Sequence, residues 1–471
     1  MKEMFGKVWK IGILVLLLTI IGCATYYQRN VKFQKYITKG EFNKANGWLE
    51  EESKDKKGRN ELLFQLNKGY VYFMMKEHTK SNLHFQKAEQ LIEEQQKDVK
   101  KEALALMLNP SVKDYRPEDF EIVMLHYFTA LNYIKLKKWE DALVECRRIN
   151  IKLNELNDKY KDHKNRYQRD AFAHNLMGMI YEANFDYNNA FIAYRNAYKV
   201  YEEDYKQYFG LNAPEQLKKD LLRTAYLTGF YDEVDYYEKK FKMKYEHQKE
   251  NNPELIFFWL TGFGPVKSQW ELSFVKGAYR NGYVTYVNKQ YGLSYRYYVG
   301  ERSDDVKEGF KNLEVFRVAF PKYVARQPHY TSAQITCNQK QYAFQKVQDI
   351  NQIAFKTLKD RMLRVFANSL LRVASKKAIQ TVVNKQNENL GTVVSIANAI
   401  TEKADTRNWQ TLPYAIYYQR VPLKKGENNI QLKAKSVQGK ENKQQFTITA
   451  EQQGMIYFHY FHHLESAQPK M

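Results

Sequence analysis

Residues 177–197 read MGMIYEANFDYNNAFIAYRNA, and this stretch decides the fold of the first half of the chain. Gly178 and Tyr181 lie on one side of a predicted first helix, because residues three apart share a helix face. A turn is predicted at 185–187, and the second helix carries Ala190 where it crosses the first. We expect Gly178 to let the two helices approach closely and Tyr181 to fill the space between neighbouring pairs. The full pattern of small and aromatic residues is Gly178, Tyr181, Ala190, Tyr194 and Ala197.

The same pattern recurs in four other windows. Its spacing matches the tetratricopeptide repeat (TPR), a helix pair of about 34 residues. The two fuller copies contain Gly69, Tyr72, Ser81, Phe85 and Ala88, and Ala130, Tyr133, Ala142, Cys146 and Ile149. A first pair is predicted at 36–49 and a last pair at 222–241, with an insert at 104–120 that contains Pro110 and Pro117. A generic helical bundle is the alternative, but the repeated match favours a TPR-like solenoid, whose concave face usually holds a peptide or a protein.

Strand patterns replace the helical ones after Pro253. Apolar runs predict strands at 255–260, 270–275, 282–287, 293–299, 315–320 and 332–337, and again at 414–421, 429–434, 444–448 and 454–459. Between the two groups, 349–403 is predicted to be an inserted helical pair, with its second helix near 390–402. The segment 423–429 is predicted to be a hairpin-type turn between two of the strands.

This order of elements predicts an α+β fold, in which an N-terminal all-α TPR-like solenoid precedes a mostly antiparallel β domain with an inserted helical pair. The predicted segments are a signal peptide, the solenoid, the basic β-rich domain and the insertion, at 1–22, 23–250, 251–471 and 349–403 respectively. The first helix of the insertion has an apolar stripe flanked by lysines and arginines. Such a helix either lies on an anionic membrane or packs on a core with its charges in water.

The net charge of +21 is concentrated in the second half of the chain. Residues 251–471 contain 31 Lys and Arg against 16 Asp and Glu, whereas the first 250 residues contain 43 against 37. Acidic partners outside the cytoplasm include phospholipid headgroups, peptidoglycan, lipopolysaccharide cores and acidic proteins. Nucleic acid would be the usual partner of a basic cytosolic protein, but the N-terminal sequence argues for export and against that partner.

The N-terminus has the features of an export signal. Three lysines, at 2, 7 and 10, precede an apolar run at 11–21, which is shorter than the roughly 20 residues that a membrane span needs. The run ends in Ile20-Ile21-Gly22-Cys23, which resembles the lipobox of bacterial lipoproteins. The resemblance implies a diacylglycerol on Cys23 and cleavage of the signal just before it. The alternatives are an uncleaved anchor and an ordinary signal peptide with an incidental cysteine.

Three further stretches extend the resemblance over nearly the whole chain. They are 127–133 with 144–148, then 262–267, and the sequence ADTRNWQTLP at 404–413. In this order behind a lipobox, they resemble a little-characterised family of TPR-containing bacterial lipoproteins. That family has no agreed activity, so the resemblance implies an architecture and an address. Ala24 stands where an aspartate would favour the inner membrane, which implies an outer-membrane lipoprotein facing the periplasm.

The candidate binding residues form two groups, Glu145, Arg147 and Arg148, and Asp405, Arg407 and Trp409. The first group lies on a repeat helix and is predicted to be a satisfied polar cluster, with a contact in the groove as the alternative. In the second group, the acid and the arginine are predicted to pair or to cap a helix. The tryptophan is predicted to anchor in the core, and ligand binding is the alternative for this group.

Motifs of metal binding and catalysis are few. His459, His462 and His463 are weak candidates for metal ligands, since no carboxylate or cysteine accompanies them. The sequence contains no HExxH, CxxC or GxSxG motif. We therefore expect no cofactor, no metal and no enzymatic activity. Cys146 is expected to be a small buried apolar residue, and a disulfide to Cys337 is not indicated.

These observations predict a membrane-anchored lipoprotein that acts as a protein-binding scaffold in the biogenesis or maintenance of the cell envelope. Its expected partners are the membrane, through the lipid, and an envelope protein. One alternative is a structural lipoprotein that binds peptidoglycan or glycolipid, and another is an enzyme that acts on these molecules. The scaffold is favoured because the repeats offer a binding face, whereas no acid, base and nucleophile stand together in the sequence.

Overall fold

The computed structural model describes most of the chain after its first 24 residues, and the described ranges are 25–97, 113–158, 166–247, 252–386 and 403–470, apart from positions 52, 54, 312 and 452. Cys23 and the whole predicted signal peptide lie outside the described residues. The same holds for most of the predicted insert at 104–120 and for the predicted helix at 390–402.

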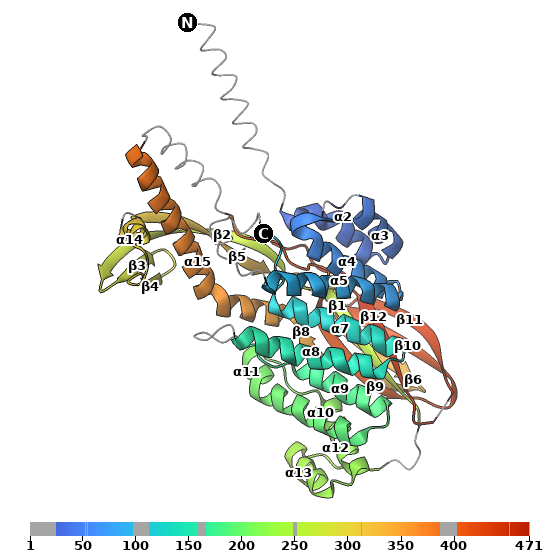
Figure 1. Cartoon of the computed structure of the whole chain (residues 1–471). Helices are drawn as coiled ribbons and strands as arrows, with labels where there is room; N and C mark the ends of the chain where they lie inside the picture. Colours follow the sequence, from blue (N-terminus) through green and yellow to red (C-terminus); the bar gives the residue numbers. More distant parts are fainter. Residues whose placement is uncertain are drawn as a thin grey trace.

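Helices that pack in consecutive pairs fill the described chain up to residue 241 (Figure 1). The pairs are α2 (Tyr26–Thr38) with α3 (Phe42–Glu51), α4 (Glu61–Met74) with α5 (His78–Lys97), α7 (Asp119–Lys135) with α8 (Trp139–Asp158), α9 (Ala171–Ala183) with α10 (Tyr187–Val200), and α12 (Glu215–Thr228) with α13 (Tyr231–Phe241). Three short elements connect them, namely η1 (Gly58–Asn60), η3 (Tyr201–Tyr205) and α11 (Lys206–Phe209). The pairs are stacked in chain order, with α2 and α13 at opposite ends of the stack.

The five turns inside these pairs have one geometry. Each turn has one residue with positive φ, which is 71° at Gly40, 62° at Lys76, 58° at Lys137, 60° at Phe185 and 82° at Gly229. In each turn, the amide of this residue donates to the carbonyl three residues earlier, and the next amide donates to the carbonyl five residues before itself. This is the Schellman pattern that ends a helix. The pairs are therefore copies of one helix–turn–helix unit, which confirms the predicted TPR-like solenoid.

Small residues of the repeat pattern lie where the two helices of a pair approach each other. A Cβ atom on Gly178 would overlap the ring of Tyr194, and one on Gly69 would overlap the ring of Phe85. Glycine is therefore required at both crossings. The fully buried positions of the pattern include Ala130, Ala142, Ala190, Tyr194 and Ala197. The half-buried positions, on the sides of the first helices, are Tyr72, Tyr133 and Tyr181.

Three four-stranded sheets follow the helices. The central sheet has the order β12 (Ile456–His463), β1 (Glu254–Phe263), β9 (Pro413–Pro422), β8 (Gln345–Asp349). The outer sheet has the order β11 (Glu441–Ala450), β10 (Gly426–Ser436), β6 (Tyr330–Cys337), β7 (Lys340–Ala343). The side sheet has the order β4 (Leu293–Tyr298), β3 (Tyr283–Asn288), β2 (Val266–Arg280), β5 (Val315–Val324). Strands β1 and β12 are parallel, and the other pairings are antiparallel. The predicted α+β fold is thus confirmed.

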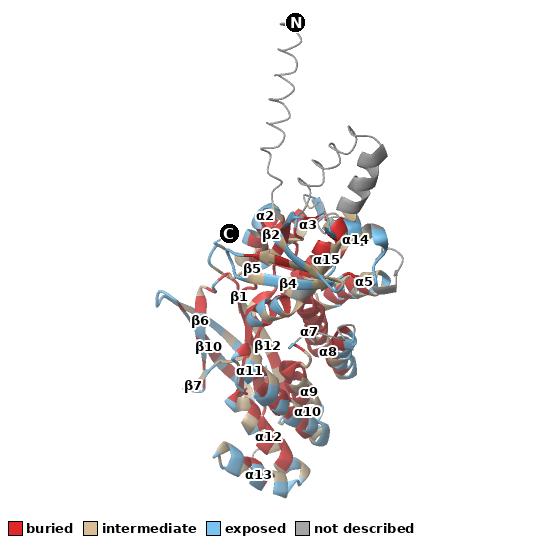
Figure 2. Cartoon of the chain, turned by 90° about the vertical axis from the view of Figure 1, so that its left-hand side faces the viewer, coloured by how far each residue is buried: buried red, intermediate tan, exposed pale blue. Residues whose placement is uncertain are grey.

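The central sheet is buried on both faces, because alternate residues of a strand point to opposite sides. In β1, Ile256 and Phe258 belong to the same core as the helices, whereas Phe257 and Trp259 belong to the core shared with the outer sheet. The molecule therefore has a helical layer, a central sheet and an outer sheet in succession. Figure 2 shows β6, β7 and β10 on one side of this view and α7, α8, α9 and α10 on the other, with buried residues between them.

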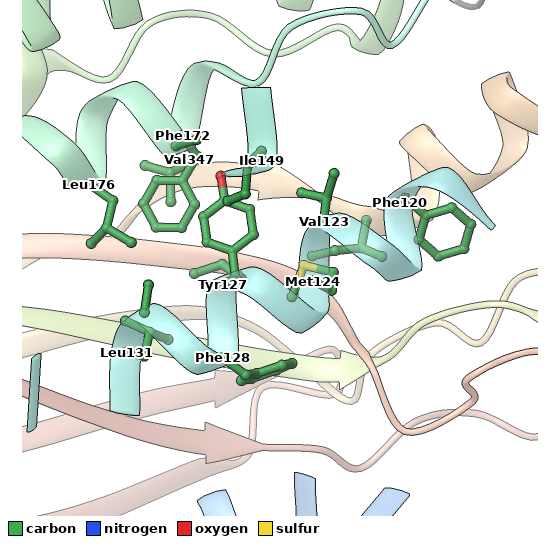
Figure 3. Packing of buried hydrophobic residues seen from close by; sticks show 14 of the residues in the cluster. Phe120, Val123, Met124, Tyr127, Phe128, Leu131, Ile149, Phe172, Leu176 and Val347 are labelled. Carbon is green, nitrogen blue, oxygen red and sulfur yellow. The ribbon is translucent and has the colours of Figure 1, made fainter. Parts of the chain in front are cut away.

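The helical layer and the central sheet share one continuous core. Figure 3 shows Tyr127 and Phe128 of α7 at its centre, with Val347 of β8 beside Phe172 and Leu176 of α9. All five side chains are at most 1% exposed. Because helix and strand side chains interdigitate here, the solenoid and the central sheet form one packed unit.

The helix α15 (Ile350–Gln386) packs across the side sheet together with α14 (Asp304–Lys311). Phe366 of α15 stacks on Tyr295 and contacts Phe274, so the apolar stripe of this helix covers a core. Arg361 pairs with the buried Glu118. Of the two interpretations of this basic helix, core packing accounts for the described side chains. No helix in the described ranges is long and apolar enough to cross a bilayer.

One sequence prediction about the β domain is wrong. The segment 423–429 does not form a hairpin turn, because β9 belongs to the central sheet and β10 to the outer sheet. This segment instead carries the chain from one sheet to the other. The sequence prediction failed because an alternating pattern identifies the buried face of a strand and says nothing about which strand lies beside it. Cys146 and Cys337 are both buried and unpaired with each other.

Candidate functional site

The first helices of the pairs form one face of the solenoid, which we call the inner face, and the β domain lies against it. Phe258 of β1 packs on Phe172 of α9, with 5.9 Å between ring centroids. Tyr460 of β12 stacks on Phe73 of α4 at 4.6 Å. The segment 404–413 covers the part of this face formed by α4 and α7. The face where TPR-like solenoids usually bind partners is therefore occupied by the chain itself.

Trp409 occupies a space between the second and third helix pairs. Its ring lies 6.4 Å from that of Tyr70 and 5.9 Å from those of Phe85 and Phe128, and the side chain is 1% exposed. Its backbone N–H donates to Oε1 of Glu121 at 2.7 Å. The predicted anchoring residue thus anchors the segment in the solenoid, as a bound peptide would do.

Arg407 holds the start of the same segment. Its Nε and Nη2 atoms donate to the two oxygens of Asp405 at 2.8 and 2.7 Å, which is a bidentate pair. Its Nη1 donates to Oδ1 of Asn60 at 2.8 Å, and Nη2 also donates to the carbonyl of Lys113 at 2.9 Å. All three nitrogens of the guanidinium are thus engaged within the chain, which supports the structural interpretation of this group over ligand binding.

The residues after Trp409 continue this docking. Gln410 accepts a hydrogen bond from the side-chain amide of Gln34 at 2.8 Å, and Thr411 donates to Asn67 at 3.0 Å. Arg326 donates to Oε1 of Gln34 at 2.6 Å and to the carbonyl of Gln410. The segment is therefore bound along α2 and α4 by a series of buried polar contacts, which are costly to leave unpaired.

Glu121 lies next to Trp409, and its carboxyl group is fully buried. It accepts hydrogen bonds from the N–H groups of Trp409 and Glu118, at 2.7 and 2.8 Å, and from the hydroxyl of Tyr115. Burial raises the pKa of Glu121 to about 7, against the opposing effects of Lys267 and of the hydrogen bonds from Tyr115 and Trp409. A neutral acid at this position is thus populated at moderately acidic pH.

The raised pKa of Glu121 predicts a pH dependence of stability. Between its ordinary value of 4.5 and about 7, the folded chain binds more protons at this group than the unfolded chain does. The free energy of unfolding should therefore fall as pH rises through this window, by up to about 3 kcal/mol. The charged groups that act on the carboxyl are Lys267, which lowers its pKa, and Asp405, which raises it. Denaturation of wild type and Glu121→Gln across this range measures the difference, since other titrations are common to both. Parallel profiles of the two proteins would contradict the prediction.

A second polar cluster joins the distal repeats to the central sheet. Arg420 of β9 donates to Glu182 of α9 at 2.7 Å, to Asp220 of α12 at 3.1 Å and to Glu254 of β1 at 2.8 Å. Arg223 donates to Glu182 and Asp220 as well, both at 2.8 Å. Burial alone would raise the pKa of Glu182, yet the two guanidinium groups hold it below its ordinary value. This cluster is a buried interdomain ion-pair network.

The predicted group of Glu145, Arg147 and Arg148 lies on the repeat helix α8, away from segment 404–413. Glu145 is buried and pairs with Nδ1 of His126 at 2.7 Å and with Arg148 at 3.0 Å. Arg148 also reaches Glu89 of α5, whereas Arg147 is exposed and not part of this network. The structure thus brings Glu145 and Arg148 together in a cluster between helix pairs and leaves Arg147 at the surface.

Of the three histidines of β12, His463 is buried, and His459 and His462 are half-buried. Burial lowers the pKa of His459, His462 and His463 to about 4, so each is neutral at physiological pH. The ring of His459 stacks on Phe446 with 4.9 Å between centroids. Within the described ranges, no three His, Cys, Asp or Glu side chains are arranged to hold a metal ion.

The buried polar residues that fix the β domain on the solenoid were not among the residues predicted from the sequence. Glu121, Glu182 and Asp220 are each buried on the inner face, and Arg420 reaches the last two. A signal was present in the sequence, because Glu121 directly precedes the apolar run at 122–125 and Glu182 directly follows the repeat tyrosine. An acid on the buried side of a helix implies a partner of opposite charge.

Comparisons with known proteins found no matching family model and no matching curated protein. Several solved structures are similar to part of the chain. The apo form of RapI is 16% identical with a TM-score of 0.32, over 46% of this chain and 68% of that one. MamA is 16% identical with a TM-score of 0.28, over 45% and 87%. A tetratricopeptide repeat protein from Parabacteroides merdae ATCC 43184 is 14% identical with a TM-score of 0.29, over 46% and 67%.

Proposed function

We propose that this chain is a lipid-anchored, non-enzymatic scaffold of the bacterial cell envelope, held at the outer membrane on the periplasmic side and bound to an envelope protein. The lipobox-like sequence at 20–23 supports the anchor. Thr25 is the N-cap of α2 and forms a capping box with Gln28. The described part of the fold therefore begins two residues after the proposed site of acylation.

The observation that carries this proposal is the inner face filled by the chain's own β domain. Because segment 404–413 and the central sheet pack on this face, the solenoid and the sheets form one rigid body. A partner can therefore bind only to the outer surfaces of this body. The buried carboxylates Glu121, Glu182 and Asp220 all accept hydrogen bonds from the chain itself. Such groups stabilise a fold, and this arrangement supports a binding role over a catalytic one.

The proposed partner binds the last two helix pairs. Large apolar side chains that stay 37–61% exposed gather there, and they are Phe185, Ile192, Leu227, Phe230, Tyr231 and Tyr236. The ring of Phe230 contacts the buried Phe191, so the exposed groups rest on an ordered core. Exposed aromatic groups on a rigid support are typical of protein-binding surfaces. This end of the stack lies opposite α2, where the anchor would be (Figure 1).

Mass spectrometry of the mature N-terminus tests the anchor. Wild-type protein should begin at Cys23 and carry the mass of a diacylglycerol, whereas Cys23→Ala should retain the precursor mass. Cys146→Ala is the matched control, because this buried cysteine should not affect processing. A wild-type N-terminal peptide with an unmodified thiol would contradict the proposal.

Photocrosslinking in living cells tests the partner surface. A crosslinking amino acid at Tyr231 or Tyr236 should capture the same envelope protein in stoichiometric amount. The matched control is Thr447, which is exposed on the outer sheet. The proposal would be wrong if both sites on the last pair gave no product, or if Thr447 captured the same protein equally well.

A further inference from the structure

Helix α2 exposes basic side chains together with the uncharged Gln28 and Val31. Residues 25–40 contain four cations and no acid. Lys32, Lys35 and Lys39 are exposed and follow one another at three- and four-residue spacing, which places them in one row along the helix. We call this row the α2 basic strip. Arg29 is exposed beside it, and its guanidinium lies 5.5 Å from the ring of Tyr26.

The α2 basic strip is held in a fixed position on the body. The opposite side of α2 is buried, with Phe33 1% and Ile37 0% exposed. The hydroxyl of Tyr27 donates to Gln468 at 2.5 Å, and Gln34 donates to Gln410 at 2.8 Å. The helix cannot rotate without breaking these contacts, so the direction in which the strip faces is a property of the whole molecule.

The strip begins close to the proposed anchor. Cys23 and Thr25 are two positions apart, which corresponds to at most about 7 Å of extended chain. Helix α2 then rises about 1.5 Å per residue, so Lys32 lies about 9 Å along it from Tyr26. These distances are comparable with the Debye length of about 8 Å at physiological ionic strength. An acyl chain on Cys23 would therefore bring Lys32 within electrostatic reach of lipid headgroups. Lys35 and Lys39 lie about 14 and 20 Å along the helix from Tyr26, and they reach the same surface when α2 lies along the bilayer.

We infer that the α2 basic strip docks on anionic phospholipid headgroups and sets the orientation of the anchored body. This inference rests on the proposed acylation of Cys23. A bilayer is favoured over a protein as the occupant because residues 25–40 carry four cations and no acid, and the N-cap of α2 is two positions from Cys23. Docking along α2 holds the opposite end of the helix stack, with α13, away from the membrane (Figures 1 and 2). The partner-binding surface on the last pairs thereby stays accessible.

The expected effect is a shift in the equilibrium between docked and undocked bodies. Each cation near an anionic surface contributes about 1 kcal/mol. Lys32→Gln, Lys35→Gln and Lys39→Gln together should therefore lower the ratio of docked to undocked protein by about 100-fold. The matched control is Lys219→Gln, Lys239→Gln and Lys242→Gln, which removes the same charge from exposed positions of the last helix pair.

Fluorescence quenching on vesicles measures docking directly. The acylated full chain with Val31→Cys carries a dye next to the strip, because Val31 is 41% exposed and the two remaining thiols are buried. Vesicles contain a headgroup spin-labelled lipid in phosphatidylcholine, with or without phosphatidylglycerol. Quenching should be strong only with phosphatidylglycerol at low salt, should be lost in the triple α2 variant, and should persist in the control.

Equal quenching on neutral and anionic vesicles, or quenching that survives the triple α2 variant, would overturn the inference while leaving the anchor intact. Dye that is shielded only when a co-purified protein is present would assign the strip to that protein and also overturn it. Failure of acylation gives a different result, because the wild-type chain would then not remain on phosphatidylcholine vesicles. The two proposals are thus separable in one experiment.

Discussion

Replacing Trp409 with alanine is expected to lower the free energy of unfolding by about 3–5 kcal/mol, which is the usual loss when a buried large aromatic side chain is truncated. The ring lies among Tyr70, Phe85 and Phe128 of two helix pairs. Its removal leaves a cavity between these pairs and segment 404–413. Because the same contacts hold the β domain on the inner face, proteolysis within 404–413 should also become faster.

Chemical denaturation followed by circular dichroism measures the loss, and limited proteolysis reports on the segment. Trp270→Ala is the matched control, because Trp270 is half-buried and packs on Tyr291 and Phe320 inside the side sheet. The control should be less destabilised and should leave the cleavage rate within 404–413 unchanged. A loss below about 1 kcal/mol for Trp409→Ala would show that this contact does not join the two parts.

The contacts that could be predicted from the sequence join residues that lie close together in the chain. Gly178 and Tyr194 meet across a single turn, and the repeated spacing of small and aromatic residues therefore identifies the helix pairs. Asp405 and Arg407 are two residues apart, so their pairing needed no knowledge of the fold. Each of these contacts is decided by helix or turn geometry, and such geometry is readable from spacing alone.

The contacts that place the β domain on the solenoid are not local. Glu121 accepts from Trp409 over 288 positions, and Arg420 reaches Glu182 over 238. Strand β1 pairs with β12, and the paired residues lie 202 positions apart in the chain. A single sequence shows which side of a helix or strand is buried, but it does not show what covers that side. For this reason the inner face was predicted to be open to a partner, whereas the chain fills it.

Replacing Arg420 with alanine is expected to be as damaging as the loss of Trp409, with a decrease of about 3–5 kcal/mol in the free energy of unfolding. The guanidinium is 3% exposed and lies 2.7 Å from Glu182, 3.1 Å from Asp220 and 2.7 Å from Glu254. Without it, Arg223 alone faces three carboxylates. The buried charges then lack compensation, and this deficit outweighs the small volume that is removed.

Two comparisons separate this mechanism from a simple packing loss. Arg317→Ala breaks an exposed ion pair with Glu271, and it should cost below about 1 kcal/mol. The double variant Arg420→Met with Glu182→Gln should be more stable than Arg420→Met alone, because fewer uncompensated charges remain. The deficit of Arg420→Ala should also shrink as the pH falls, since a protonated Glu182 needs no cation beside it. A deficit that is constant with pH and unchanged by Glu182→Gln would instead mean that Arg420 acts through its packing, and that the charge network does not hold the distal repeats to the sheet.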